Sequence, residues 1–124
     1  MITKNNNIIN GKLCNNNKYR NTKVIYDGIK FDSKKEARRY IELKLLEKTN
    51  QIKDLELQKK FELQPSYKKN GKIIRAINYY ADFYYYDIIK GKYIVEDTKG
   101  MKTEVYKLKK KLFEYKYDIT IIET

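Results

Sequence analysis

The chain has 124 residues, with 28 Lys and Arg against 16 Asp and Glu, one Cys and no His. The absence of His excludes Ser-His-Asp and Cys-His nucleophiles and His-metal finger nucleases, and a single Cys excludes an intrachain disulfide and a Cys-ligated zinc site. The net charge of +12 favours a polyanionic partner such as nucleic acid, although the codon usage of an AT-rich genome would also enrich Lys.

The first part of the chain predicts an arm, a hairpin and a helix. Residues 1–21 carry eight Asn and four basic residues but no acid, which is typical of a flexible basic arm. Asp27-Gly28 lies between two short alternating apolar runs and predicts a type I′ hairpin turn. Ser33 and Glu36 have the spacing of a capping box, which predicts a helix that extends to Lys48. Its apolar side chains share one face at the helical period: Ala37, Tyr40, Ile41 and Leu45, with Leu43 beside them and Glu36 at the edge.

The rest of the chain predicts strands followed by a second helix. One or two strands are expected over residues 52–63, a turn at Asn70-Gly71, a long strand over 73–88, a turn at Lys90-Gly91 and a strand over 92–98. Thr103 can cap a helix that runs to about Tyr117, and residues 118–123 are expected to form a closing strand. The sequence therefore predicts an α+β fold, with a mixed, largely antiparallel central sheet flanked by two helices, in one domain over residues 22–124. The inward face of the second helix is predicted to carry Val105, Leu108, Leu112 and Tyr115.

The last hairpin brings two acids and a lysine together. A two-residue turn at Lys90-Gly91 places Asp82 opposite Lys99 and Tyr84 opposite Asp97. Because side chains alternate along a strand, all four point to one face of the sheet. Asp82 and Asp97 are then diagonal neighbours, with Cα atoms about 7–8 Å apart. Two carboxylates at this separation can bind one hard divalent cation, Mg²⁺ or Mn²⁺, which prefers oxygen ligands.

These groups suffice for phosphodiester hydrolysis without His. A divalent cation offsets the repulsion of two acids among apolar neighbours, polarises a phosphoryl oxygen and lowers the pKa of a bound water. Lys99 can orient or deprotonate the attacking water, or stabilise charge that builds on the phosphate. Asp97 and Lys99 can equally form a plain ion pair on an exposed strand, and that alternative stays open.

An acid on one strand, followed after a hairpin by Asp-x-Lys, resembles the PD-(D/E)XK nuclease superfamily. The elements here are Ala81-Asp82 and Glu96-Asp97-Thr98-Lys99, with Ala81 in place of the Pro of the motif. The stretch over residues 31–40 is similar to the N-terminal helix motif of the resolvase-like branch, and residues from about 18 to 117 resemble small phage and prophage proteins likened to Holliday junction resolvases. The resemblance implies a restriction-endonuclease-like core, Glu36, Asp82 and Asp97 as metal-site acids, and Lys99 as the catalytic lysine.

Structural roles compete with the functional ones. Glu36 has the alternative role of capping-box acid for Ser33. Glu96 alternates to the face opposite Asp97 and is interpreted as a surface or cross-strand ion-pair residue. Asp54 and Asp87 are interpreted as solvated strand or turn residues, and the tyrosines at positions 84–86 as sheet packing rather than base-stacking groups.

Basic residues near the proposed acids are candidates for phosphate contacts. The second helix carries Lys107, Lys110 and Lys111 away from its predicted apolar face, directly after the proposed site. A lysine-rich helix face is often merely solvated, so the two interpretations stay open. The residues predicted to contact DNA are Arg38 and Arg39 on the first helix and Lys102, Lys107 and Lys110 around the second.

Three hypotheses follow for the function. The first is a Mg²⁺- or Mn²⁺-dependent endodeoxyribonuclease, selective for four-way junctions by resemblance alone and then a homodimer, because two symmetric cuts need two sites. The second is a nucleic-acid-binding module that keeps the scaffold without cutting, and the third is a phage structural or host-interaction protein. The lone thiol and the absence of a long apolar run predict a cytoplasmic location, in the bacterial host if the gene is carried by a phage.

Overall fold

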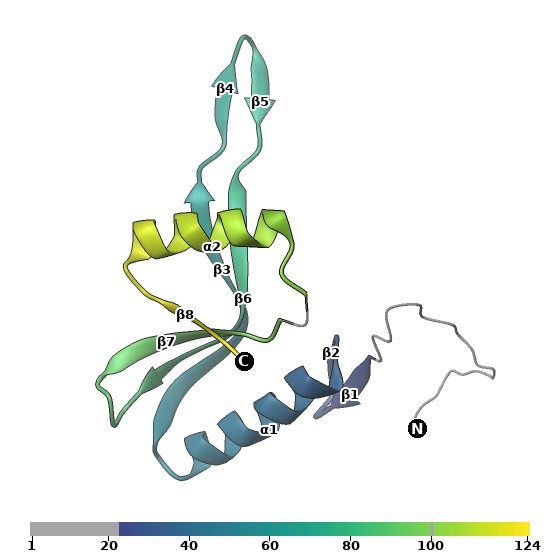
Figure 1. Ribbon diagram of the computed structural model, residues 1–124, viewed down its shortest axis with the longest axis vertical. Helices are drawn as coiled ribbons and strands as arrows, with labels where there is room; N and C mark the ends of the chain where they lie inside the picture. Colours follow the sequence, from purple (N-terminus) through teal and green to yellow (C-terminus); the bar gives the residue numbers. More distant parts are fainter. Residues whose placement is uncertain (1–22, 100) are drawn as a thin grey trace, which may run out of the picture. The chain divides into compact units, whose positions relative to one another are not determined.

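The structure is a computed structural model that describes residues 23–99 and 101–124. The arm predicted over residues 1–21 lies outside the described residues. No helix within the two described ranges is long and apolar enough to cross a membrane. In chain order (Figure 1) the elements are β1 (Val24–Tyr26), β2 (Ile29–Phe31), α1 (Lys34–Lys48), β3 (Ile52–Gln64), β4 (Tyr67–Lys69), β5 (Lys72–Ile74), β6 (Ile77–Asp87), β7 (Lys92–Asp97), α2 (Glu104–Tyr117) and β8 (Ile121–Glu123).

The chain divides into two compact units that meet within α1, between Glu42 and Leu43. The prediction of one domain over residues 22–124 stays a prediction. In the first unit, β1 and β2 pair as a hairpin whose turn residues, Asp27 and Gly28, have φ values of 55° and 74°. Positive φ at both central positions is the requirement of a type I′ turn, and the predicted hairpin is confirmed.

The start of α1 is confirmed, but its buried face differs from the prediction. Ala37, Tyr40 and Leu43 are buried, whereas Ile41 and Leu45 are exposed. Tyr40 packs against the hairpin, with its ring centroid 5.1 Å from that of Phe31. Because an aromatic ring buries more area than an aliphatic side chain, the contact between Tyr40 and the hairpin sets the rotation of the helix.

The second unit contains a four-stranded sheet in the order β3-β6-β7-β8. The β3–β6 and β6–β7 pairs are antiparallel, and β8 pairs with β7 in parallel. The predicted α+β class and the mixed, largely antiparallel sheet are therefore confirmed. Figure 1 shows α2 crossing one face of β3 and β6, and it covers an aromatic core there.

Helix α2 has the predicted start and end but the opposite buried face. Thr103 caps it by accepting a hydrogen bond from the backbone N–H of Tyr106, at 3.1 Å. The helix buries Tyr106 and Phe113 against Phe61 and Tyr79. The bulk of the aromatic rings outweighs the regular aliphatic spacing on which the prediction rested. The side chains predicted to face inward are exposed instead: Val105, Leu108, Leu112 and Tyr115.

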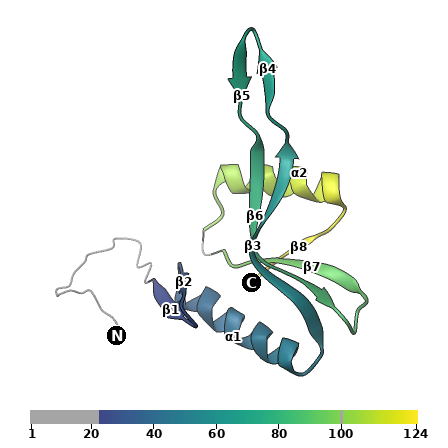
Figure 2. The same ribbon diagram turned by 180° about the vertical axis from the view of Figure 1, so that it is seen from behind.

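The long strand predicted over residues 73–88 is two strands. It breaks at Arg75-Ala76, so that β4 and β5 form a two-stranded sheet of their own beyond the four-stranded one. Asn70 and Gly71 form the predicted turn of this hairpin, with φ values of 52° and 76°. Figures 1 and 2 show the hairpin extending past α2.

The register between β6 and β7 is shifted by two residues from the prediction. The loop has four residues, 88–91, rather than two, and Asp87 pairs with Lys92. Asp87 closes this loop, because its backbone oxygen accepts from the N–H of Gly91 at 2.8 Å and its Oδ1 from the N–H of Lys90 at 2.9 Å. An even shift leaves every side chain on its predicted face.

Candidate functional site

Asp82 and Asp97 meet where the pairing of β6 with β7 ends, at the last residue of β7. The paired register closes with Phe83 opposite Glu96, and Asp82 and Asp97 are the next residue on each strand. Oδ2 of Asp82 accepts hydrogen bonds from the backbone N–H and the hydroxyl of Thr98, both at 2.8 Å. The prediction that Asp82 faces Lys99 is wrong, because the four-residue loop moves the register and brings Asp82 to the level of Asp97.

Asp82 is also held from its other side. Nε2 of Gln58 donates to Oδ1 of Asp82 at 3.0 Å. Gln58 lies opposite Asp82 on β3, between the pairs Leu57–Phe83 and Lys59–Ala81, and has a φ of 51°. Three donors therefore fix the Asp82 carboxylate within β6, beside the end of β7.

Asp97 is a fully buried carboxylate with an incomplete set of partners. Its residue is 0% exposed. The Tyr79 hydroxyl donates to Oδ2 at 2.6 Å, whereas Oδ1 accepts no hydrogen bond from any of the described residues. Nζ of Lys99 lies 3.4 Å from Oδ1. An ion pair without a hydrogen bond compensates only part of the cost of burying this oxygen.

Burial raises the pKa of the Asp97 carboxyl to about 7. A hydrogen bond that the protonated carboxyl donates to Asp82, and the negative charge of Asp82, act in the same direction. The hydrogen bond from Tyr79 and the charge of Lys99 lower that pKa, but they do not outweigh burial. In turn, burial and the contact with Asp97 raise the pKa of the Tyr79 phenol. Near neutral pH, Asp97 is therefore poised between its charged and uncharged forms.

Lys99 links Asp97 to the start of α2. Its Nζ lies 4.6 Å from the ring centroid of Tyr106, within the range of a cation–π contact, as well as beside Asp97. Its side chain is 30% exposed. The ammonium thus contacts the buried carboxylate while part of the side chain remains accessible to solvent. The ion pair that the sequence left open as an alternative is present, but Asp97 is buried and not on an exposed strand as that alternative supposed.

Glu123 is a member of this site that the sequence prediction missed. It pairs in register with Asp97 through the parallel β7–β8 ladder. Oε2 of Glu123 accepts a hydrogen bond from the Tyr106 hydroxyl at 2.7 Å, and Lys102 and Lys110 lie 3.1 and 3.2 Å from its carboxylate oxygens. The bond from Tyr106 and these two lysines lower the pKa of Glu123 to about 2. The only signal in the sequence was an acid in the closing strand, which does not reveal a parallel partner.

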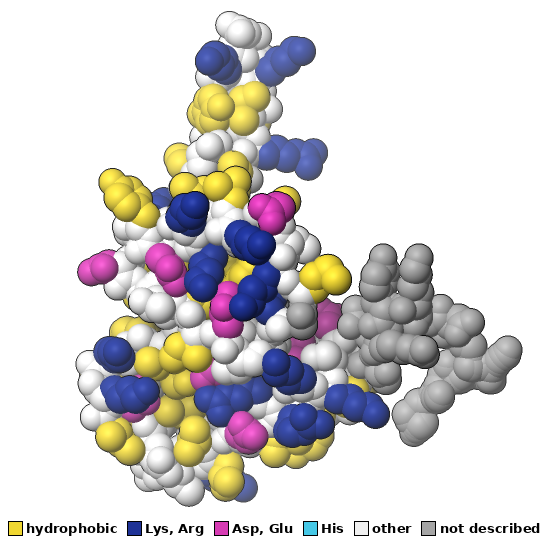
Figure 3. Space-filling view, in the orientation of Figure 1, with side chains coloured by type: hydrophobic (Ala, Val, Ile, Leu, Met, Phe, Trp, Pro, Cys, Tyr) yellow, Lys and Arg dark blue, Asp and Glu magenta, His cyan; other side chains and the backbone are white. Residues whose placement is uncertain are grey.

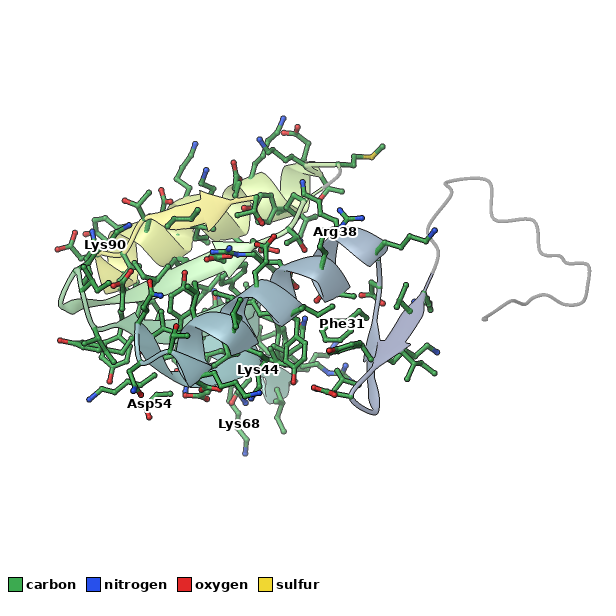
Figure 4. The ribbon with its side chains drawn as sticks, turned by 90° about the horizontal axis from the view of Figure 1, so that it is seen from below. Phe31, Arg38, Lys44, Asp54, Lys68 and Lys90 are labelled. Atoms are coloured by element: carbon green, nitrogen blue, oxygen red, sulfur yellow. The ribbon has the colours of Figure 1, made fainter. Side chains whose placement is uncertain are left out.

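The residues predicted to contact DNA fall into two groups. Lys102 and Lys110 converge on Glu123 beside the acids, which places two predicted phosphate ligands at the site. The second group is Lys107 on α2, which pairs with Glu104 at 3.2 Å, and two residues of the first unit: Arg39 pairs with Glu42 at 2.9 Å, and Arg38 (labelled in Figure 4) is exposed on α1. Their roles in DNA binding stay predictions.

Glu96 corrects the prediction of a surface residue. It is 1% exposed, and the Tyr85 hydroxyl donates to its Oε2. As predicted, the Glu96 side chain points to the face of the sheet opposite Asp97. That face is buried at this position, and Glu96 can lie there because the Tyr85 hydroxyl hydrogen-bonds to its carboxylate. The tyrosines beside it pack as predicted, with the rings of Tyr84 and Tyr93 stacked at 5.1 Å.

Glu36 has the capping geometry that competes with its proposed role as a metal ligand. Its backbone N–H donates to Oγ of Ser33 at 3.1 Å, and its Oε1 accepts from the N–H of Asp32 at 3.2 Å. It is 7% exposed. Glu36 belongs to the first unit, and its participation in the metal site stays a prediction.

The second unit offers a donor set that fits one hard divalent cation. Asp82 and Asp97 supply adjacent carboxylates, and Oδ1 of Asp97 is a buried oxygen without a hydrogen-bond donor among the described residues. Within those same residues, no three Asp, Glu, Cys or His side chains gather as a metal-binding group. Mg²⁺ is often held by one or two carboxylates, with water and phosphate oxygens completing its shell, so two acids suffice.

Comparisons with known proteins point to one family. No curated protein and no solved structure is significantly similar to the chain. A family described as "Protein of unknown function (DUF1064)" matches residues 16–122, which include both acids and Lys99. The match spans well over half of the sequence, and the chain belongs to the DUF1064 family.

Proposed function

We propose that the protein is a Mg²⁺- or Mn²⁺-dependent endodeoxyribonuclease that hydrolyses DNA phosphodiesters at the Asp82–Asp97 site. One observation carries the proposal. A fully buried carboxylate, with one oxygen lacking a hydrogen-bond donor among the described residues, lies beside a second carboxylate and a lysine. Burying such a group costs free energy that a structural role would not require, whereas a cation-binding role explains it.

Each residue has a role that its contacts support. Asp82 and Asp97 would hold the cation, which when bound polarises the phosphate and acidifies a water. The Tyr79 hydroxyl fixes the orientation of Asp97 by donating to Oδ2, which leaves Oδ1 to bind the cation. Lys99, at the border between the buried acid and solvent, would orient the attacking water or stabilise charge on the phosphate. Beside them, Lys102 and Lys110 would attract the phosphate backbone.

The preference for branched DNA is the finer part of the proposal. It rests on the resemblance to Holliday junction resolvases and includes a homodimer, because paired cuts across a junction need two sites related by a two-fold axis. It also includes action in the cytoplasm, on phage DNA if the gene is phage-borne. The lack of a membrane-spanning helix in the described ranges is compatible with that location.

Replacing Asp97 with Asn should reduce Mg²⁺-dependent cleavage by roughly 1,000-fold, because loss of one carboxylate ligand forfeits several kcal/mol of transition-state stabilisation. The measurement is single-turnover cleavage of four-way junction, flap, linear duplex and single-stranded DNA. Asp54→Asn is the matched control, since it removes the same charge from an exposed site on β3 (Figure 4). Asp54 has a φ of 58°, a conformation that Asn tolerates. Absence of cleavage by the wild-type protein on all substrates, or equal cleavage by Asp97→Asn, contradicts the proposal.

A second candidate is a binding module that holds nucleic acid without cutting it. The finding of only two adjacent acids among the described residues favours it, because many phosphodiester hydrolases use more ligands. It predicts binding that is sensitive to salt but not to metal. Under this alternative, Asp82→Asn and Asp97→Asn leave binding unchanged or tighter and no product forms with any substrate.

A further inference from the structure

The β4–β5 hairpin concentrates positive charge on an isolated two-stranded ribbon. Between Pro65 and Ala76 the sequence has four basic residues and no acid. Residues 66–75 are all exposed. Figure 3 shows the ribbon at the top of the molecule, with Lys and Arg side chains on both of its sides and no acidic side chain on the visible part. The basic residues are Lys68, Lys69, Lys72 and Arg75.

The hairpin is set apart by the absence of any acid within its own sequence, so its four cations have no acidic neighbour along the ribbon. On β3 and α1, by contrast, acids lie among the lysines, so that Lys59 pairs with Glu56 at 3.4 Å and Lys44 pairs with Glu47 at 3.0 Å. Over the parts of the chain that the structure describes, no ion pair joins an acid to any basic residue of the hairpin. Lysine-rich composition accounts for the number of cations but not for the missing acids.

The ribbon also exposes apolar side chains. A negatively charged partner that also offers apolar groups could cover them. Tyr67, Ile73 and Ile74 are 47%, 69% and 36% exposed. The pairing puts Tyr67 and Ile74 on one face together with Lys69 and Lys72. An isolated two-stranded hairpin is only marginally stable in water, so a ribbon of this kind gains from a partner that covers it.

We propose that the β4–β5 hairpin binds in a groove of duplex DNA, with its basic residues on the phosphates and Tyr67 and Ile74 toward the base edges. The major groove of B-form DNA, about 12 Å wide, admits a two-stranded β-ribbon, and thymine methyl groups on its floor offer apolar contacts. The major groove of an RNA duplex is too narrow for this, which makes DNA the expected partner. The inference rests on the proposed function only in taking DNA as the ligand and does not require cleavage.

The test measures binding to a linear DNA duplex by fluorescence anisotropy in EDTA, so that no cleavage occurs. The hairpin variant carries Lys68→Gln, Lys69→Gln, Lys72→Gln and Arg75→Gln. Its matched control removes the same charge from exposed lysines of the same unit, with Lys48→Gln, Lys53→Gln, Lys90→Gln and Lys92→Gln. We expect the hairpin variant to bind at least 10-fold more weakly at physiological salt, and its slope of log affinity against log salt to become less steep by about three to four. The control should stay within about threefold of the wild type.

Loss of affinity in the control equal to that in the hairpin variant overturns the proposal, because binding would then follow net charge alone. An equal hairpin-dependent loss on an RNA duplex overturns the assignment to a DNA groove. If the quadruple variant does not fold, Lys69→Gln with Lys72→Gln carries the same comparison against Lys90→Gln with Lys92→Gln, since both pairs lie at a hairpin turn. Hairpin-dependent binding without cleavage under Mg²⁺ contradicts only the nuclease proposal, and cleavage with unchanged binding of the hairpin variant contradicts only the ribbon.

Discussion

The metal-free protein should lose stability relative to its Asp97→Asn variant as the pH rises from 4 to 8. The pKa of Asp97 is about 7 in the folded protein and 3.8 in an ordinary setting, so folding favours the protonated form. The stabilising contribution of that form is complete below the unfolded pKa and is lost as the pH rises through the folded pKa. At 1.36 kcal/mol for each pKa unit, the loss approaches roughly 4 kcal/mol at pH 8. Asn carries no charge at any pH and escapes the loss.

Urea unfolding in EDTA at several pH values measures this difference. The Asp54→Asn variant is the control and should follow the wild-type profile, because Asp54 is exposed. Added Mg²⁺ should restore stability to the wild type at pH 8 and not to Asp97→Asn, since a ligand that binds only the folded state stabilises it. Parallel pH profiles for the wild type and Asp97→Asn would show that Asp97 ionises as an ordinary acid.

Phe113→Ala should destabilise the protein by about 3–5 kcal/mol, whereas Leu112→Ala should change stability by less than about 1 kcal/mol. Phe113 is 0% exposed, and its ring lies 4.8, 5.3 and 5.1 Å from those of Phe61, Tyr79 and Tyr117. Leu112 is 43% exposed. Thermal and urea unfolding compare the two variants directly. If Leu112→Ala lost more stability than Phe113→Ala, the helix would instead bury the aliphatic face that the spacing predicted.

Local signals in the sequence were sufficient for turns and helix caps. Asp27-Gly28 and Asn70-Gly71 adopt the positive φ values that their residue types favour, and Ser33 and Thr103 cap the helices as expected. Such features depend on only a few neighbouring residues, so the chemistry of those residues determines them.

Features that depend on distant partners could not be predicted in the same way. The buried faces of both helices follow aromatic contacts such as Tyr40 with Phe31, which the aliphatic period does not reveal. Glu96 is buried because Tyr85 supplies a hydroxyl, and Glu123 reaches the site through a parallel pairing with β7. The two acids nevertheless share one face as predicted, although they lie directly opposite each other rather than as diagonal neighbours, because a register error of two residues preserves the face on which a side chain lies.

A crystal structure of the protein soaked in Mn²⁺, with the ion located by its anomalous scattering, tests the central claim most directly. We expect an ion in contact with carboxylate oxygens of both Asp82 and Asp97, including Oδ1 of Asp97, which lacks a hydrogen-bond donor among the described residues. The Asp97→Asn crystal should lack that ion. An ion bound elsewhere, or no ion while Lys99 keeps its 3.4 Å contact with Oδ1, would contradict the account.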